Sequence, residues 1–285
     1  MKKVLFVGLG RMGYPVAGHI AKTESLSVSV YNRSAPKIDS WLDQYKGAAF
    51  SPDDIFDVII LCIGNDEDVR STLTGSLNLL HKVKPGGTIV DHTTTSAALA
   101  QEMYAAAKER SVGYLDAPVS GGEAGAVNGQ LSCMIGGDES HLNNIATILD
   151  GYCKNVIHIG GPGSGQIAKM ANQLCIAGTL AGLSEAITLL QKSNINTDQV
   201  FQAIKGGAAQ SWQMDNRFAT MTKGEFDFGF AIDHMIKDLK YALQLTDQQQ
   251  WQPEISRKVL HWYESLSKQG HSTYDTSCLI KKYKD

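Results

Sequence analysis

A lysine and two carboxamides lie within five residues of one another, directly after a glycine-rich turn. Residues 163–173 begin as that turn and continue as a helix predicted to reach about Ser193. Residues three and four apart share a helix face, so Lys169, Asn172 and Gln173 point the same way. A lysine and a carboxamide on one face can give and take a proton while they hold a small acid. The competing interpretation is an ordinary solvated helix start.

Three glycines near the chain start have the spacing of a dinucleotide-binding fingerprint. Gly8, Gly10 and Gly13 follow a predicted strand and open a helix, and a second strand comes within about thirty residues. In this context Gly8 permits a tight turn, Gly10 lets a pyrophosphate approach the backbone, and Gly13 lets the helix pack on the strand. The segment predicts a nucleotide site that includes Arg11 and Met12. The competing interpretation is a glycine-rich turn without a ligand.

The end of the second predicted strand indicates which nicotinamide cofactor is bound. An Asp or Glu is expected there when NAD is preferred, because it binds the ribose hydroxyls. This chain has Asn32, Arg33 and Ser34 instead. Arg33 can stack on the adenine or bind a 2′-phosphate, and Ser34 can donate to that phosphate. The pattern favours NADP(H) over NAD(H), and the competing interpretation of Arg33 is an exposed turn arginine.

The next two predicted strands are expected to end over the dinucleotide, because ligands lie beyond the carboxyl ends of parallel strands. Cys62 and Ile63 end the third strand, and Thr94 lies in a hydroxyl run after the fourth. We expect Cys62 and Ile63 to contact the cofactor. For Thr94 two interpretations stay open, a helix cap and a contact with the nicotinamide ribose.

Ser120, Gly121 and Gly122 follow the fifth predicted strand. A hydroxyl and exposed amides in such a turn can form a concave anion-binding nest. A substrate carboxylate suits this nest, and the competing interpretation is a flexible turn.

Strands and helices alternate through the first half of the chain. The pattern predicts an α/β fold with a Rossmann-type, doubly wound parallel sheet. Helices are predicted between the strands, one of them at residues 66–80, and residues 85–87 are predicted to form a turn. Strands are predicted at residues 2–7, 27–31, 57–63, 88–92, 114–117, 131–135 and 156–159.

Strand signals disappear after Gly163, and the glycines just before it mark a predicted boundary. We expect a dinucleotide-binding domain at residues 1–162 and an all-helical domain for substrate binding and oligomerisation at residues 163–285. The predicted helices of this half cover residues 165–193, 197–206, 233–249, 252–268 and 272–282.

Two residues of the helical half are further candidates for a site. Trp212 ends a break of small residues and can line a substrate pocket, although a buried tryptophan packed between helices is the simpler interpretation. Lys237 interrupts an amphipathic segment beside Asp238. The pair is either an ordinary solvated ion pair or has a role near the cofactor.

Composition argues against several classes of partner. The net charge is −3 and no basic block occurs, so neither nucleic acid nor an anionic membrane is expected. The five cysteines are scattered, and no CxxC or HExxH pairing occurs, so neither a disulfide framework nor a metal site is predicted. Reduced thiols in the cytoplasm are the simplest account. No apolar run approaches the roughly 20 residues that span a bilayer.

Taken together, the motifs resemble the β-hydroxyacid dehydrogenases, the group that contains 3-hydroxyisobutyrate dehydrogenase, tartronate semialdehyde reductase and the glyoxylate/succinic semialdehyde reductases. They occur in order over nearly the whole chain. The matching pieces are GLGRMG, DHTTTS, DAPVSGG, the GxGxxxKxxN helix start and IKDL.

The resemblance implies a two-domain oxidoreductase in which a long interdomain helix follows the Rossmann domain. By similarity, Lys169 is the catalytic residue, Thr94 touches the cofactor, and Lys237 closes over it. Members of the family commonly form dimers or tetramers through the helical domain, so a homodimer or homotetramer is expected. By the same similarity, the substrate carboxylate and hydroxyl are held by Ser120, Gly121, Gly122 and Asn172, with Gln173 beside them.

The chain also departs from the family pattern. Many members carry Asn-Asn where this chain has Asn172 and Gln173. The Asn-Arg-Ser strand end resembles the NADPH-using semialdehyde reductases. An imine reductase on the same plan is one alternative, but such relatives usually lack Lys169. The 6-phosphogluconate dehydrogenases have a much larger helical domain. A non-catalytic NADP-binding regulatory protein is a further alternative, against which the intact Lys169 argues.

The expected reaction is hydride transfer between NADP(H) and C3 of a small β-hydroxyacid or its semialdehyde. Lys169 would donate a proton during reduction and accept one during oxidation. An unperturbed lysine has a pKa near ~10.4 and is a poor base at neutral pH. Burial or a neighbouring positive charge would have to lower that pKa.

Overall fold

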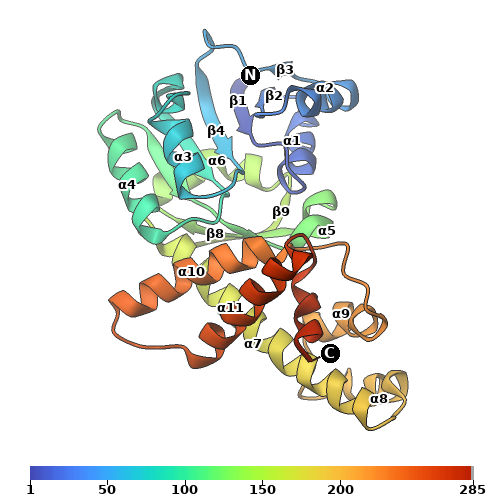
Figure 1. The fold of residues 1–285 in the computed structure, drawn as a ribbon. Coiled ribbons are helices and arrows are strands. Elements are labelled where there is room, and N and C mark those ends of the chain that lie inside the picture. Colours follow the sequence, from blue (N-terminus) through green and yellow to red (C-terminus); the bar gives the residue numbers. More distant parts are fainter. Residues whose placement is uncertain (284–285) are drawn as a thin grey trace. The chain divides into compact units, whose positions relative to one another are not determined.

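The protein folds as two compact units, Met1–Lys169 and Met170 onward. The structure is a computed structural model, and it describes residues 1–283 of the chain. In Figure 1 the unit that contains the sheet runs from blue to green, and the helical unit runs from yellow to red. The unit boundary falls inside one long helix, whose first turn belongs to the sheet unit.

Within residues 1–283, nine strands form one sheet in the first unit. The strands β3, β2, β1, β4, β5 and β6 lie in that order and are all parallel. The strand β8 then pairs antiparallel with β6 and β7, and parallel with β9. The strand bounds are β1 Lys2–Val7, β2 Leu26–Tyr31, β3 Ala48–Ala49, β4 Phe56–Leu61, β5 Val83–Asp91, β6 Gly113–Asp116, β7 Val119–Ser120, β8 Leu131–Gly136 and β9 Cys153–Gly160.

Both faces of the sheet are buried at the central strands β1 and β4, as their continuous apolar residues predict, whereas β3 and most of β9 are exposed. In β1, Val4 and Phe6 belong to one hydrophobic cluster, while Leu5 and Val7 belong to another. The predicted α/β class and doubly wound sheet are confirmed. The helices of the first unit are α1 Gly13–Ala21, α2 Ala35–Gln44, α3 Asp66–Leu73, α4 Ala97–Lys108, α5 Gly122–Val127 and α6 Glu139–Leu149.

Two local predictions in the first unit are wrong. The helix predicted over residues 66–80 ends at Leu73, because the chain turns at Gly75 and then reaches Asn78, which has a left-handed backbone. A short 3-10 helix, Leu79–Lys82, follows. The turn predicted at residues 85–87 lies inside β5, where Gly86 has a positive φ and the register against β4 shifts.

The second unit is helical, with one core formed by its helices. One helix was not predicted: α9 begins at the break of small residues, where Ser211 accepts the backbone N–H of Met214 and so caps it. The predicted helix at 272–282 is a 3-10 helix, Thr276–Tyr283. The α-helices are α7 Ser164–Lys192, α8 Thr197–Ile204, α9 Trp212–Lys223, α10 Ile232–Gln248 and α11 Glu254–Leu266.

The long helix α7 corrects the expectation that no segment is apolar enough to cross a membrane. Among the described residues, α7 alone meets that criterion, with 29 residues and a mean hydropathy of 1.4 in its most apolar window. One such helix is weak evidence for a membrane, because core helices of water-soluble proteins meet the same criterion.

Candidate active site

The glycine turn after β1 contains two glycines that the fold requires and one that it does not. Gly8 has a φ of 101°, and a β-carbon there would lie 2.2 Å from the carbonyl oxygen of Cys62. A β-carbon on Gly13 would lie 1.9 Å from the carbonyl oxygen of Gly8, whereas one on Gly10 would meet no atom within 4 Å. Met12 precedes the first turn of α1. The open backbone at Gly10 and the start of α1 therefore fit a dinucleotide pyrophosphate.

The three polar residues after β2 differ in what they contact. The Asn32 side chain accepts the backbone N–H of Leu9 at 3.0 Å, so it stabilises the glycine turn. Arg33 is 81% exposed, and its guanidinium lies 3.0 Å from an Asp68 carboxylate oxygen. Ser34 occupies the N-cap position of α2. Arg33 thus lies at the surface in an ion pair that is weak because it is exposed to solvent.

Cys62 and Ile63 follow β4 and are fixed through their backbones. The N–H of Cys62 donates to the Val7 carbonyl at 2.9 Å, and the N–H of Ile63 donates to the Thr93 hydroxyl at 3.1 Å. Burial raises the pKa of the Cys62 thiol to about 12. The thiol is therefore neutral near pH 7 and available for packing rather than for nucleophilic chemistry.

The neighbouring residues of the hydroxyl run after β5 have different roles. Ser96 is the N-cap of α4: its hydroxyl accepts the N–H of Leu99 at 3.1 Å and donates to Asp66 at 2.6 Å. The interpretation of Thr94 as the helix cap is therefore wrong. Thr94 is half-buried. In the sequence it lies between Thr93, whose hydroxyl accepts the Ile63 N–H, and Ser96. Its predicted contact with the cofactor stays a prediction.

Lys169 lies beside the predicted carboxylate nest. Its side chain is buried, with 8% exposure, and its Nζ donates to the Val119 carbonyl at 2.9 Å. Val119 directly precedes Ser120, Gly121 and Gly122. Gly121 has a φ of 130° and Gly122 a φ of 62°, values that L residues rarely adopt. The segment is not a simple loop, because it ends β7 and opens α5.

The start of α7 is anchored by two buried residues that sequence reasoning missed. Asp116 accepts the backbone N–H of Gly163 at 2.8 Å and that of Gln166 at 2.9 Å. The Gln166 side chain accepts the N–H of Thr95 at 3.0 Å and donates to the Thr93 carbonyl at 2.8 Å. These bonds fix the helix that carries Lys169 to the ends of β5 and β6. Burial raises the pKa of Asp116 to about 6, although the backbone donors oppose the shift.

The second unit contains the remaining polar candidates. Asn172 and Gln173 come one helical turn after Lys169 on α7. The Asn172 amide donates to the Gln173 side chain at 2.8 Å, and Gln173 donates to Asp238 at 2.7 Å. The Nζ of Lys237 lies 3.0 Å from the other Asp238 oxygen. The interpretation of Lys237 and Asp238 as a solvated pair is wrong for Asp238, which is buried.

Trp212 is not packed between helices, contrary to the simpler expectation. It is the first residue of α9 and is 56% exposed. The Arg217 guanidinium lies 4.9 Å from the centre of its ring. The indole is thus held over an arginine at the surface of its unit, and its predicted contact with substrate stays a prediction.

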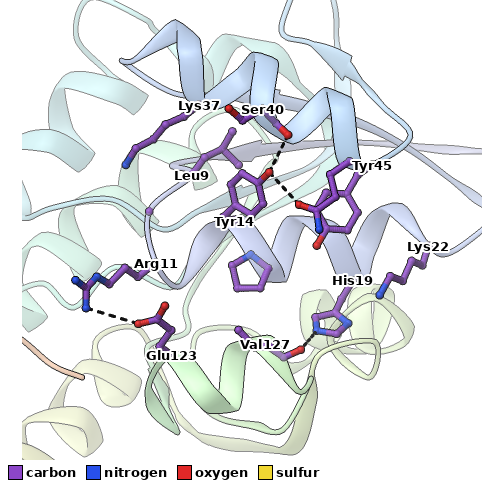
Figure 2. Close-up of a pocket in the computed structure, with 13 residues that line it drawn as sticks. Leu9, Arg11, Tyr14, His19, Lys22, Lys37, Ser40, Tyr45, Glu123 and Val127 are labelled. Carbon is purple, nitrogen blue, oxygen red and sulfur yellow. Dashed lines mark hydrogen bonds and ion pairs between the residues drawn. The ribbon is translucent and has the colours of Figure 1, made fainter. Parts of the chain in front are cut away.

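A pocket of about 540 Å³ adjoins the glycine turn in the first unit (Figure 2). Arg11 lies near one end of it and is 3.7 Å from the Glu123 carboxylate of α5. Tyr14 projects between α1 and α2 and donates to the Ser40 carbonyl at 2.8 Å. Among the predicted site residues, Gly10 and Arg11 line this pocket. The other lining residues are Leu9, Pro15, His19, Lys22, Lys37, Gln44, Tyr45 and Val127.

The sequence matches two family models that together cover nearly the whole chain. Residues 3–160 match the NAD binding domain of 6-phosphogluconate dehydrogenase. Residues 163–283 match the model described as NAD-binding of NADP-dependent 3-hydroxyisobutyrate dehydrogenase.

Individual proteins match over their full length. An uncharacterized oxidoreductase of Shewanella frigidimarina is 41% identical over 99% of this chain and 98% of its own. The 2-hydroxy-3-oxopropionate reductase of Escherichia coli K12 is 31% identical over 98% of this chain and 96% of its own. The solved structure of Mycobacterium tuberculosis 3-hydroxyisobutyrate dehydrogenase with L-serine has a TM-score of 0.90 at 26% identity and covers both chains completely.

Proposed function

Because the chain belongs to the β-hydroxyacid dehydrogenase family, we propose that it transfers hydride between NADP(H) and a small β-hydroxyacid or its semialdehyde. The observation that carries the proposal is the position of Lys169. Its ammonium is buried and bonded to the carbonyl of Val119, the residue before the Ser120–Gly122 turn. An acid or base group therefore lies next to a turn that suits a carboxylate.

Lys169 is the proton donor and acceptor in this proposal. A nicotinamide cofactor whose pyrophosphate is bound at the glycine turn would supply or take up the hydride. During reduction of the semialdehyde, Lys169 Nζ donates its proton to the carbonyl oxygen, which becomes the hydroxyl. During oxidation, neutral Lys169 accepts the hydroxyl proton. Such general acid–base catalysis typically contributes ~10²–10⁴ in rate.

The substrate and cofactor contacts follow from the neighbouring segments. The amides and hydroxyl of Ser120, Gly121 and Gly122 bind the carboxylate, and Asn172 contacts the rest of the substrate. NADP(H) is preferred over NAD(H), because Arg33 and Ser34 replace the acidic residue that would repel a 2′-phosphate.

We further propose that residues 1–162 and 163–285 act as the cofactor and substrate domains, that the enzyme works in the cytoplasm, and that it is a homodimer or homotetramer. The second unit supports the oligomer, because α7 exposes a row of small and apolar residues. That row contains Ala171, Cys175, Gly182, Ala186 and Leu189.

The decisive experiment combines a substrate panel with one substitution. Purified protein is mixed with NADPH and small semialdehydes, and the loss of absorbance at 340 nm is followed. Lys169→Ala is expected to lower turnover at least ~100-fold, because the proton donor is lost, while NADPH still binds. Lys192→Ala, at the exposed end of the same helix, is the matched control.

Two results would contradict the proposal. One is a Lys169→Ala variant with turnover close to that of the control. The other is a wild-type protein that binds NADPH but reduces no semialdehyde on the panel, which would leave the imine reductase and regulatory alternatives.

A further inference from the structure

A buried polar chain connects α7 with α10 in the second unit. Gln173 and Asp238 are each about 1% exposed. The Gln173 Nε2 donates to Asp238 Oδ2 at 2.7 Å, and the Asn172 Nδ2 donates to Gln173 Oε1 at 2.8 Å. The Nζ of Lys237 lies 3.0 Å from Asp238 Oδ1. The chain of contacts thus begins at a buried carboxylate and ends at Asn172.

The carboxylate determines the direction of every hydrogen bond in this chain. A carboxylate paired with an ammonium group has lone pairs but no proton, so it accepts only. Gln173 must then turn its NH₂ group to Asp238 and its oxygen to Asn172. Asn172 must turn its own NH₂ group to that oxygen. The orientation of a carboxamide is often ambiguous, but here the charge of Asp238 determines both orientations.

We propose that Asp238 is a positioning residue that fixes which end of the Asn172 carboxamide faces the substrate. The proposal rests on the proposed function, in which Asn172 contacts the substrate. With its NH₂ group held by Gln173, Asn172 turns its oxygen away from Gln173. An amide oxygen accepts from a hydroxyl or ammonium group and repels a carboxylate.

This orientation of the Asn172 carboxamide determines which end of the substrate can bind beside it. The donor-bearing end of a β-hydroxyacid, and not its carboxylate, is then the end that Asn172 binds. Gln173 is suited to the link, because its side chain reaches a carboxylate on the neighbouring helix while its oxygen still faces the adjacent Asn172. Asp238 acts through Gln173 and needs no contact with the substrate itself.

The test reverses the polarity of the pair and then restores it. In Asp238→Asn, residue 238 can donate, so Gln173 is free to rotate. We expect kcat/KM for the best semialdehyde to fall at least tenfold at saturating NADPH. In Gln173→Glu, two carboxylates face each other, and a similar loss is expected. In the double variant Q173E/D238N, a carboxylate at 173 again accepts from both neighbours, and kcat/KM should rise at least threefold above that of D238N.

A matched control and a measurement that needs no turnover complete the test. Asp233→Asn changes an exposed aspartate of the same helix, which accepts from Ser267, and should stay within twofold of wild type. In protein labelled with ¹⁵N at Asn and Gln, the side-chain NH₂ signals of Asn172 and Gln173 should move in D238N. The Asn172 signal should return toward its original position in the double variant.

Two outcomes would overturn the proposal. One is a D238N variant within twofold of wild type with unmoved NH₂ signals, and the other is a double variant no better than D238N. Because the NH₂ signals are recorded without substrate, they decide the orientation of both amides even if no semialdehyde is reduced. Failure of the proposed function would be seen separately, in wild-type protein on the substrate panel.

Discussion

Of the three polar residues after β2, Asn32 stabilises the fold, whereas Arg33 is available to bind a ligand. Asn32 is committed to the backbone of Leu9, so its side-chain oxygen stabilises the glycine turn. Arg33 is exposed, and its Asp68 partner belongs to the surface of α3. A surface ion pair is weak and is screened by salt, so a phosphate could compete for Arg33 with little cost to the fold.

Arg33→Ala is therefore expected to change cofactor preference and not stability. The Michaelis constant for NADPH should rise at least tenfold, because a charge-assisted bond to the 2′-phosphate is lost, while that for NADH changes less than threefold. Steady-state kinetics with both cofactors measure this, with Arg110→Ala as a surface control. Equal effects on the two cofactors would argue against a contact with the 2′-phosphate.

The sequence identified residues whose role follows from local spacing, and it missed those whose role depends on distant partners. The glycines and Lys169 belong to short motifs. Gln166 and Asp116 were missed, because their partners lie about 50 to 70 residues away and become visible when β5, β6 and α7 come together. The expected burial of Trp212 was wrong, because no local pattern shows which face of α9 packs inward.

At the scale of elements, different glycines of the β1–α1 turn serve helix packing and cofactor binding. Gly13 lets α1 approach the backbone of Gly8, whereas a β-carbon on Gly10 would meet no atom of the described chain within 4 Å. Most element boundaries were predictable, because apolar runs and caps are local signals. The position of Gly86 within β5 was not predictable, since strand pairing overrides the turn preference of Pro-Gly-Gly. The early end of α3 was missed although Gly75 and Asn78 are local signals.

A pair of glycine substitutions should separate the two roles. Gly10→Ala is expected to keep the wild-type melting temperature but to weaken NADPH binding at least tenfold, because the methyl group occupies the approach of the pyrophosphate. Gly13→Ala should lower the free energy of unfolding by about 1–3 kcal/mol, because its β-carbon overlaps the Gly8 carbonyl. Thermal melts and fluorescence titration with NADPH measure both. Loss of stability in Gly10→Ala would contradict this division.

The Asp116 anchor of α7 should make stability depend on pH. Its folded-state pKa of about 6 lies above the ordinary value of 3.8, because burial disfavours the charged form. The folded state therefore binds this proton more tightly than the unfolded state does. The resulting stabilisation is fully present below about pH 4 and is lost as the pH rises through 6.

Comparison of wild type with Asp116→Asn isolates this contribution. Between about pH 4 and 7, the free energy of unfolding of wild type should fall relative to that of the variant by about 2 kcal/mol. Urea denaturation at each pH gives the two free energies. A difference between the two proteins that does not change with pH would contradict the assignment.

At the scale of the whole molecule, α7 is an apolar helix that a single chain leaves largely exposed. The helix is apolar enough to serve as a core helix, but only 39% of its most apolar window is buried within the described chain. In the second unit its exposed row includes Ala171, Cys175, Gly182 and Leu189, the last of which is 66% exposed. Small residues allow two helix backbones to approach closely, so a second copy of α7 suits this row.

Wild-type protein is therefore expected to elute with at least twice the mass of one chain in light scattering coupled to size exclusion. Gly182→Arg should shift it to the mass of a single chain at micromolar concentration, because a charged side chain cannot be buried in an apolar contact without a partner. Gly206→Arg is the matched control, since a β-carbon at either glycine meets no atom within 4 Å. A G182R variant that keeps the wild-type mass would exclude this face of α7 from the interface, and a monomeric wild type would exclude the oligomer itself.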